Sequence, residues 1–94
     1  MCSAERTAAA GASLPEQADA VLRQLRLIAE ESGSSLENLL KVTLYVTDLA
    51  ALPELRTTLF RHYGAHLPAS SVVQVQGLFT ETINIEIEAI IALP

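Results

Sequence analysis

Two carboxylates close to the end of the chain, Glu86 and Glu88, are the residues whose type and spacing most suggest chemistry. They lie in residues 83–93, where the alternation of isoleucines with polar residues is typical of a β-strand with one apolar face. Along a strand the two carboxylates would point to the same side about 6.6 Å apart, too far to share one proton. A carboxylate on a partly covered surface can still orient a water or transfer a proton. The alternative is that both are rim charges paired with basic side chains of a neighbouring subunit.

Other polar side chains carry weaker signals. His62 and His66 stand four residues apart, but Gly64 between them is expected to end a helix. With no third ligand nearby, we predict surface histidines and no metal site. Ser70 and Ser71 lack the G-x-S-x-G turn that exposes a serine nucleophile, so covalent catalysis by serine is not expected.

One helix and one strand are predicted in the first half of the chain. The helix should begin at Ser13, because residues 13–16 (SLPE) have the spacing of a capping box, and it should end at Gly33. Residues 42–47 alternate strictly and predict a half-buried strand. Tyr45 falls on the outer face of this strand, where packing is the simpler interpretation and participation in a site is the alternative.

A second helix and two strands are predicted in the second half. Asp48 is expected to cap the helix, which should end at Gly64. Residues 70–76 predict a strand that should pair with the closing strand, residues 83–93, as a hairpin. The buried stripe of the second helix is expected to consist of Leu52, Leu55, Leu59, Phe60 and Tyr63.

This order of elements predicts an α/β (α+β) sandwich in which two helices cover one face of a small sheet. A monomer would leave the second sheet face and the strand edges exposed. We therefore expect several copies to associate symmetrically, with small-molecule clefts between them. The second face would carry a mixture of apolar and polar side chains, namely Tyr45, Val72, Gln74, Glu86, Glu88, Ile90 and Ala92.

Length and composition limit the possible classes of protein. The 94 residues, half of them hydrophobic, suffice for one domain, predicted at residues 13–94, with residues 1–12 as an N-terminal arm that forms no element. A net charge of −5 repels phosphate backbones, so nucleic acid is not an expected partner. The single cysteine, Cys2, and the absence of a membrane-length apolar run predict a cytoplasmic protein without membrane contact.

Several short segments together resemble the RidA family of reactive intermediate deaminases, also known as the YjgF or endoribonuclease L-PSP family. They are residues 33–38 (GSSLEN), 41–43 (KVT), 47–48 (TD), 66–71 (HLPASS) and 86–90 (EIEAI), in the order and nearly the spacing of the family. The resemblance implies a chorismate-mutase-like fold and a homotrimer with a central barrel and clefts between subunits. It also implies small-molecule chemistry on enamines or imines without a metal or cofactor.

Two departures from the family bear on activity. Family members begin with strands that carry a tyrosine and a serine of the cleft, and nothing in residues 1–12 matches them. Ser70 stands where the family has the arginine that clamps the substrate carboxylate, and Val72 stands where it has a cysteine. One neutral hydroxyl in place of two charge-assisted bonds would weaken binding of a carboxylate by about two orders of magnitude. Glu86 matches the family glutamate that orders a water for attack on the imine carbon.

The resemblance therefore implies a RidA-like homotrimer acting on small enamine, imine or related carbonyl intermediates, with deamination of 2-aminoacrylate weak or lost. Glu86 is the expected catalytic residue, and the expected ligand contacts are Ser70, Val72, Tyr45 and Glu88. Two alternatives from other classes remain open. One alternative is a small-molecule-binding module without turnover. The other is a structural subunit completed by a longer paralogue.

Overall fold

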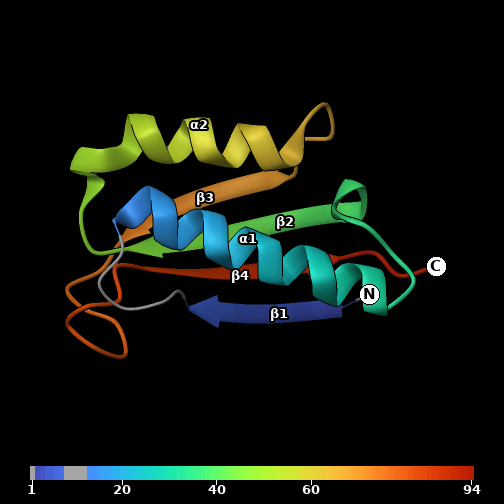
Figure 1. The fold of residues 1–94 in the computed structure, drawn as a ribbon, viewed down its shortest axis with the longest axis horizontal. Helices are drawn as coiled ribbons and strands as arrows, with labels where there is room; N and C mark the ends of the chain where they lie inside the picture. The colour runs from blue at the N-terminus through green and yellow to red at the C-terminus, as the bar shows by residue number, and fades with distance from the viewer. Residues whose placement is uncertain (1, 8–12) are drawn as a thin grey trace.

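The computed structural model of the chain describes residues 2–7 and 13–94, and Figure 1 shows their arrangement. The two helices and the last three strands appear in the predicted order, and one further strand precedes them. In chain order the elements are β1 (Cys2–Thr7), α1 (Leu14–Glu31), the 3₁₀ turn η1 (Leu36–Asn38), β2 (Leu39–Val46), the 3₁₀ turn η2 (Leu49–Ala51), α2 (Leu52–Tyr63), β3 (Ala69–Gln74) and β4 (Ile85–Ile91).

The four strands form one mixed sheet in the order β1-β4-β2-β3. β4 is antiparallel to both β1 and β2, whereas β3 is parallel to β2. The predicted hairpin between β3 and β4 is therefore wrong. The helix between β2 and β3 makes a crossover that delivers β3 parallel to β2. The chain then returns across the end of β2 to place β4 on the other side of that strand.

β1 corrects the prediction that residues 1–12 form an arm without an element. Residues 2–7 pair with β4 along its whole length, from Cys2 opposite Ile91 to Thr7 opposite Glu86. The segment CSAERT shows no apolar alternation, so its own sequence gives no strand signal. The pairing comes instead from β4, whose backbone groups would otherwise form an open edge. The other residues of the predicted arm, 1 and 8–12, lie outside the described residues.

Both ends of α1 confirm the prediction. The Ser13 side chain accepts from the backbone N–H of Glu16, and the Glu16 side chain accepts from the N–H of Ser13, which completes the capping box. After the helix, Gly33 has φ of +78°. The backbone N–H groups of Gly33 and Ser34 bond back to Glu30 and Ala29, an arrangement that needs the left-handed conformation glycine adopts most easily.

The second helix differs from its prediction in two details. The Asp48 carboxylate accepts from the N–H of Ala50 and caps the 3₁₀ turn η2, and α2 itself begins at Leu52. Phe60 was expected in the buried stripe, but it is 56% exposed, because the buried side of α2 runs through Leu55, Leu59 and Tyr63.

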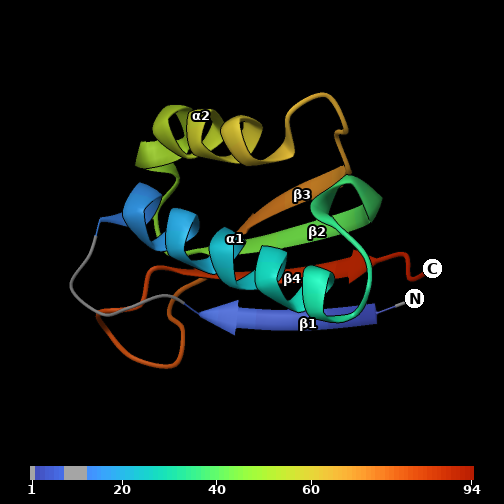
Figure 2. The same cartoon turned by 45° about the vertical axis from the view of Figure 1, so that its right-hand side comes forward.

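Both helices lie on the same face of the sheet, as Figures 1 and 2 show from two directions. The side chains of β2 and β4 that point to this face are fully buried, and they pack with the apolar stripes of α1 and α2 in one core. This burial is the main driving force for the fold. The predicted α+β sandwich with two helices on one sheet face is confirmed. The buried strand residues are Val42, Leu44 and Val46 of β2 and Ile85, Ile87, Ala89 and Ile91 of β4.

A β-bulge in β2 alters the other face, which neither helix covers. Leu39 pairs with Ile91 and Lys41 pairs with Ile90, so β2 has one extra residue between them. Leu39 and Val42 are buried, whereas Leu40 and Lys41 are both exposed. The bulge thus places two consecutive side chains of β2 on the uncovered face.

Candidate functional site

The uncovered sheet face brings together three of the five predicted site residues. Tyr45 lies directly opposite Glu86 in the antiparallel pair of β2 and β4, and Thr43 lies opposite Glu88. Tyr45, Glu86 and Glu88 are all half-buried and alternate with core residues along their strands. Directly opposite side chains of an antiparallel pair lie about 5 Å apart at their Cβ atoms. Tyr45 and Glu86 therefore begin side by side on the uncovered face, next to Glu88 on the same strand as Glu86.

The other two predicted site residues lie on the opposite face. Ser70 is in register with Val42 and Val72 with Leu44, both of which point into the core. Residues in register on parallel strands point to the same side, so Ser70 and Val72 face the helix side of the sheet. They are nevertheless exposed, because β3 is the edge strand. The prediction that Val72 and Gln74 lie on the second face is therefore wrong.

A buried glutamine fixes the start of β4 and hence the position of Glu86. Gln17 belongs to α1 and is fully buried. Its side-chain Nε2 donates to the carbonyl oxygen of Thr82 over 3.0 Å. Its Oε1 accepts from the N–H of Asn84 over 2.8 Å. Asn84 in turn accepts from the Thr47 hydroxyl at the end of β2 over 3.1 Å. One α1 side chain thus anchors the chain two residues before Glu86.

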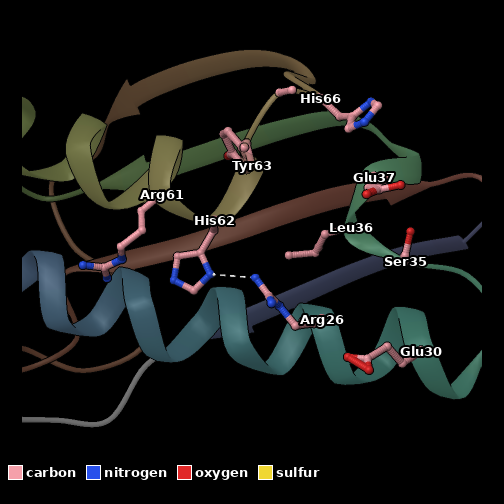
Figure 3. A pocket seen from close by; sticks show the side chains of 11 residues that line it. Arg26, Glu30, Ser35, Leu36, Glu37, Arg61, His62, Tyr63 and His66 are labelled. Carbon is pink, nitrogen blue, oxygen red and sulfur yellow. Dashed lines mark hydrogen bonds between the residues drawn. The ribbon is translucent and has the colours of Figure 1, made fainter.

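A separate cavity of about 640 Å³ lies on the helix side, between α1, η1 and the end of α2. Figure 3 shows its lining side chains, with Arg61, His62 and Arg26 toward one end and Glu30, Ser35 and Glu37 toward the other. Its volume falls in the range of small-molecule sites. Sequence reasoning did not find this cavity, because its residues come from three segments that only the packing of α1 against α2 brings together.

Asp19 joins the two helices beside this cavity. Its Oδ1 accepts from His62 Nε2 and from Arg61 Nη2, each over 2.7 Å, and its Oδ2 pairs with Arg23 Nη2 over 2.8 Å. The hydrogen bond from His62 has the largest effect on the Asp19 carboxyl and lowers its pKa below its usual range. Partial burial opposes this shift, whereas Arg61 and Arg23 add to it. The spacing of Asp19, Arg23 and Arg26 at i, i+4 and i+7 was the available sequence signal for a shared helix face.

His62 is a buried member of this network, which corrects its prediction as a surface residue. Its side chain is only 8% exposed. Arg26 Nη2 lies 3.4 Å from His62 Nδ1, and a guanidinium can only donate. Nδ1 therefore accepts, and the ring carries its proton on Nε2, which donates to Asp19. His66, by contrast, is exposed as predicted.

Tyr63 lines the same cavity from the core side. It is 6% exposed, and its hydroxyl finds no hydrogen-bond partner among the described residues. Burial raises the pKa of Tyr63 to about 12, because the phenolate would lose its hydration. The burial of this hydroxyl without a partner among the described residues costs free energy.

Two other kinds of feature are absent from the described part of the chain. No group of three or more histidine, cysteine, aspartate or glutamate residues within it is arranged to hold a metal ion. None of its helices combines the length and apolarity needed to cross a bilayer.

Comparisons with known proteins agree with this architecture. The family model described as Endoribonuclease L-PSP matches residues 3–93. The yeast Saccharomyces cerevisiae protein MMF1, named mitochondrial, is 33% identical over 76 residues, which are 81% of this chain and 50% of that protein. The chain spans between half and two thirds of the length of the curated relatives it matches.

Solved structures give the same result. Rv2704 of Mycobacterium tuberculosis, a member of the YjgF/YER057c/UK114 family, superposes with a TM-score of 0.86 at 27% identity, over 92% of this chain and 72% of that one. RidA from an Antarctic Psychrobacter superposes with a TM-score of 0.81 at 28% identity, over 86% of this chain and 65% of that one. The chorismate-mutase-like fold expected from the resemblance is thereby confirmed. The chain belongs to the RidA/YjgF family, whose model is described as Endoribonuclease L-PSP.

Proposed function

We propose that this protein acts on small enamine, imine or related carbonyl intermediates in a cleft formed between copies of the chain. The observation that carries the proposal is the placement of the two key positions. Glu86 lies on the uncovered sheet face, whereas Ser70 lies on the helix side of an edge strand. Because they face opposite sides of the sheet, a site that uses both residues would be formed by Glu86 of one copy and Ser70 of another.

A homotrimer would also bury the sheet face that neither helix covers. Leu40 is 47% exposed and Val73 is 44% exposed, and both lie on the sheet rather than in loops. Val73 is in register with Tyr45, so it belongs to the same face as Glu86. Exposed apolar side chains around a polar centre are typical of an interface that contains a site.

In this cleft Glu86 would act as the general base and positioning group. An enamine substrate first tautomerises to an imine, gaining a proton at carbon and losing one from nitrogen. A water held by the Glu86 carboxylate then adds to the imine carbon while one of its protons passes to nitrogen. The resulting carbinolamine transfers its hydroxyl proton to nitrogen and expels ammonia to leave a carbonyl. Tyr45 and Glu88 border the water, and Ser70 and Val72 of the neighbouring copy contact the substrate.

Ser70 limits the choice of substrate. A hydroxyl provides one neutral hydrogen bond where a guanidinium would provide two charged ones, so a substrate carboxylate would bind weakly. We therefore propose that deamination of 2-aminoacrylate is weak and that the preferred substrates carry a neutral polar group at this position. We also propose a cytoplasmic location for this chain, which differs from the mitochondrial location in the name of its relative MMF1.

A gain-of-function experiment tests this assignment. Freshly generated 2-aminoacrylate is supplied, and the release of pyruvate and ammonia is followed. Ser70→Arg should raise the rate by about tenfold or more, because it restores a bidentate clamp. The matched control is Gln24→Arg, at an exposed position of α1 away from the uncovered sheet face, which should have no effect.

A second substitution separates the roles within the site. Adding Glu86→Gln to Ser70→Arg should abolish the gained activity while leaving binding of pyruvate intact. Equal gains from Ser70→Arg and Gln24→Arg would contradict the proposed cleft. Binding of small amides without any turnover would favour the binding module, and solubility only with a longer relative would favour the structural subunit.

A further inference from the structure

We propose that the cavity between α1 and α2 is a second ligand site that binds a small zwitterion, with a carboxylate at one end and an ammonium at the other. The cavity lies on the helix side of the sheet, whereas Glu86 lies on the uncovered face. It is therefore separate from the proposed cleft, and its assignment does not depend on the reaction proposed there.

The first observation is the separation of charge along the cavity. Arg61, His62 and Arg26 lie toward one end, and Glu30, Glu37 and the imidazole of His66 lie toward the other, as Figure 3 shows. A ligand with a single charge would be attracted by one end and repelled by the other. A zwitterion can satisfy both ends at once, and this matched charge pattern favours it over a simple acid or amine.

The second observation is that the terminal groups have unused bonding capacity. Within residues 13–94, Arg26 makes one hydrogen bond, to the ring of His62, and no ion pair. Neither Glu30 nor Glu37 forms an ion pair or a side-chain hydrogen bond within the same range. Arg61, by contrast, is already paired with Asp19. Arg26 is thus the group with free donors for a carboxylate.

The third observation is that His62 helps to position the Arg26 side chain. His62 is 8% exposed and is fixed by its bond to Asp19, so its Nδ1 presents a fixed acceptor to Arg26. A long arginine side chain loses rotamer freedom when it binds a ligand, and prior positioning reduces that cost.

The positions of the two charged residues on α1 guide the choice of ligand length. Arg26 and Glu30 are four residues apart on α1, about 6 Å along the helix axis. An ω-amino acid with about four methylenes between its charged groups has a comparable length and serves as the probe.

Titration with 5-aminopentanoate, followed by backbone amide NMR of the full chain, tests the proposal. Pentanoate and pentylamine serve as probes that keep one charge each. We expect shifts confined to amides around Ser35, Gly64 and Ala65, and an affinity for the zwitterion about tenfold or more above that for either half-charged probe.

Matched variants keep the result specific. Arg26→Gln and Glu30→Gln should each weaken binding of 5-aminopentanoate about tenfold, whereas Arg56→Gln and Glu31→Gln should not change it, because these exposed residues lie outside the cavity. All four sites are exposed, so the variants should fold. Three outcomes would overturn the proposal: equal affinity for the three probes, shifts that map to the uncovered sheet face, or no binding at millimolar probe.

Discussion

Tyr45 and Glu86 lie directly opposite each other on β2 and β4, on the sheet face that neither helix covers. Glu86 forms no ion pair within residues 13–94, so its carboxylate contributes little to the stability of one chain. We predict that Glu86→Gln changes the free energy of unfolding of the Ser70→Arg protein by less than about 0.5 kcal/mol. Urea denaturation measures this change, and a large loss would assign Glu86 a structural role.

Gln17 should be essential for the order of the segment that leads into β4. Gln17→Ala leaves the Thr82 carbonyl and the Asn84 N–H without their buried partner, at a cost of about 1–3 kcal/mol. Thermal unfolding should show a melting temperature lower by about 5 °C or more. Gln24→Ala, on the exposed side of the same helix, is the control and should be neutral. Equal effects of the two substitutions would contradict the anchoring role of Gln17.

Asp19 should make stability depend on pH in the acidic range. Its pKa is lowered in the folded state, so its contribution is present above the unfolded pKa and is lost as the pH falls through the folded pKa. Asp19→Asn should cost about 1 kcal/mol at pH 7, because its partners Arg23 and Arg61 are largely exposed.

Denaturation of both proteins from pH 6 to pH 2 measures the difference directly. The gap between them should shrink as the pH falls below about 4, where carboxylates become protonated. Glu31→Gln, which removes an exposed carboxylate of α1, should follow the parent protein throughout. A gap that stays constant with pH would contradict the ionic network.

Tyr63 should limit stability at alkaline pH. Its pKa is raised to about 12 in the folded state, so its contribution is complete below pH 10 and is lost as the pH rises toward 12. Tyr63→Phe removes a buried hydroxyl that has no partner among the described residues. The variant should differ by less than about 1 kcal/mol at pH 7 and should lose less stability than the parent between pH 10 and pH 12. Parallel alkaline loss in both proteins would contradict the burial of this phenol.

Leu40 should contribute to association of the chains. The β-bulge places it on the uncovered face, where it is 47% exposed. Leu40→Glu introduces a charge into the proposed interface and should dissociate the assembly in sedimentation velocity experiments. Leu27→Glu, on a helix residue that is 60% exposed, is the matched control and should leave the assembly intact. Dissociation by both variants would argue against this face as the interface.

The regular elements could be predicted because their signals are local. The capping box at Ser13, the glycine after α1 and the alternation of residues 42–47 each depend on neighbours in sequence, and the structure confirms them. Pairing between strands is not local. The hairpin prediction was wrong because the crossover through α2 places β3 parallel to β2 and not next to β4. β1 was missed because its residues show no apolar alternation, and they form a strand only by pairing with the edge of β4.

The candidate sites show the same limit. The alternation of β4 placed Glu86 and Glu88 on one face correctly, but the face of Ser70 depends on its register with Val42 across two strands. The network of Asp19 and His62 spans 43 residues of sequence and arises only from the packing of the two helices. The sequence shows that these charged residues are present, but it does not show that the fold brings them within hydrogen-bonding distance.

The solution mass of the protein tests the central claim most directly, because the proposed cleft exists only between copies. Sedimentation equilibrium of the chain, whose mass is 10.1 kDa, should give about 30 kDa, as expected for a closed trimer. A mass of one chain at all concentrations up to about 0.1 mM, where even weak specific oligomers form, would contradict the account.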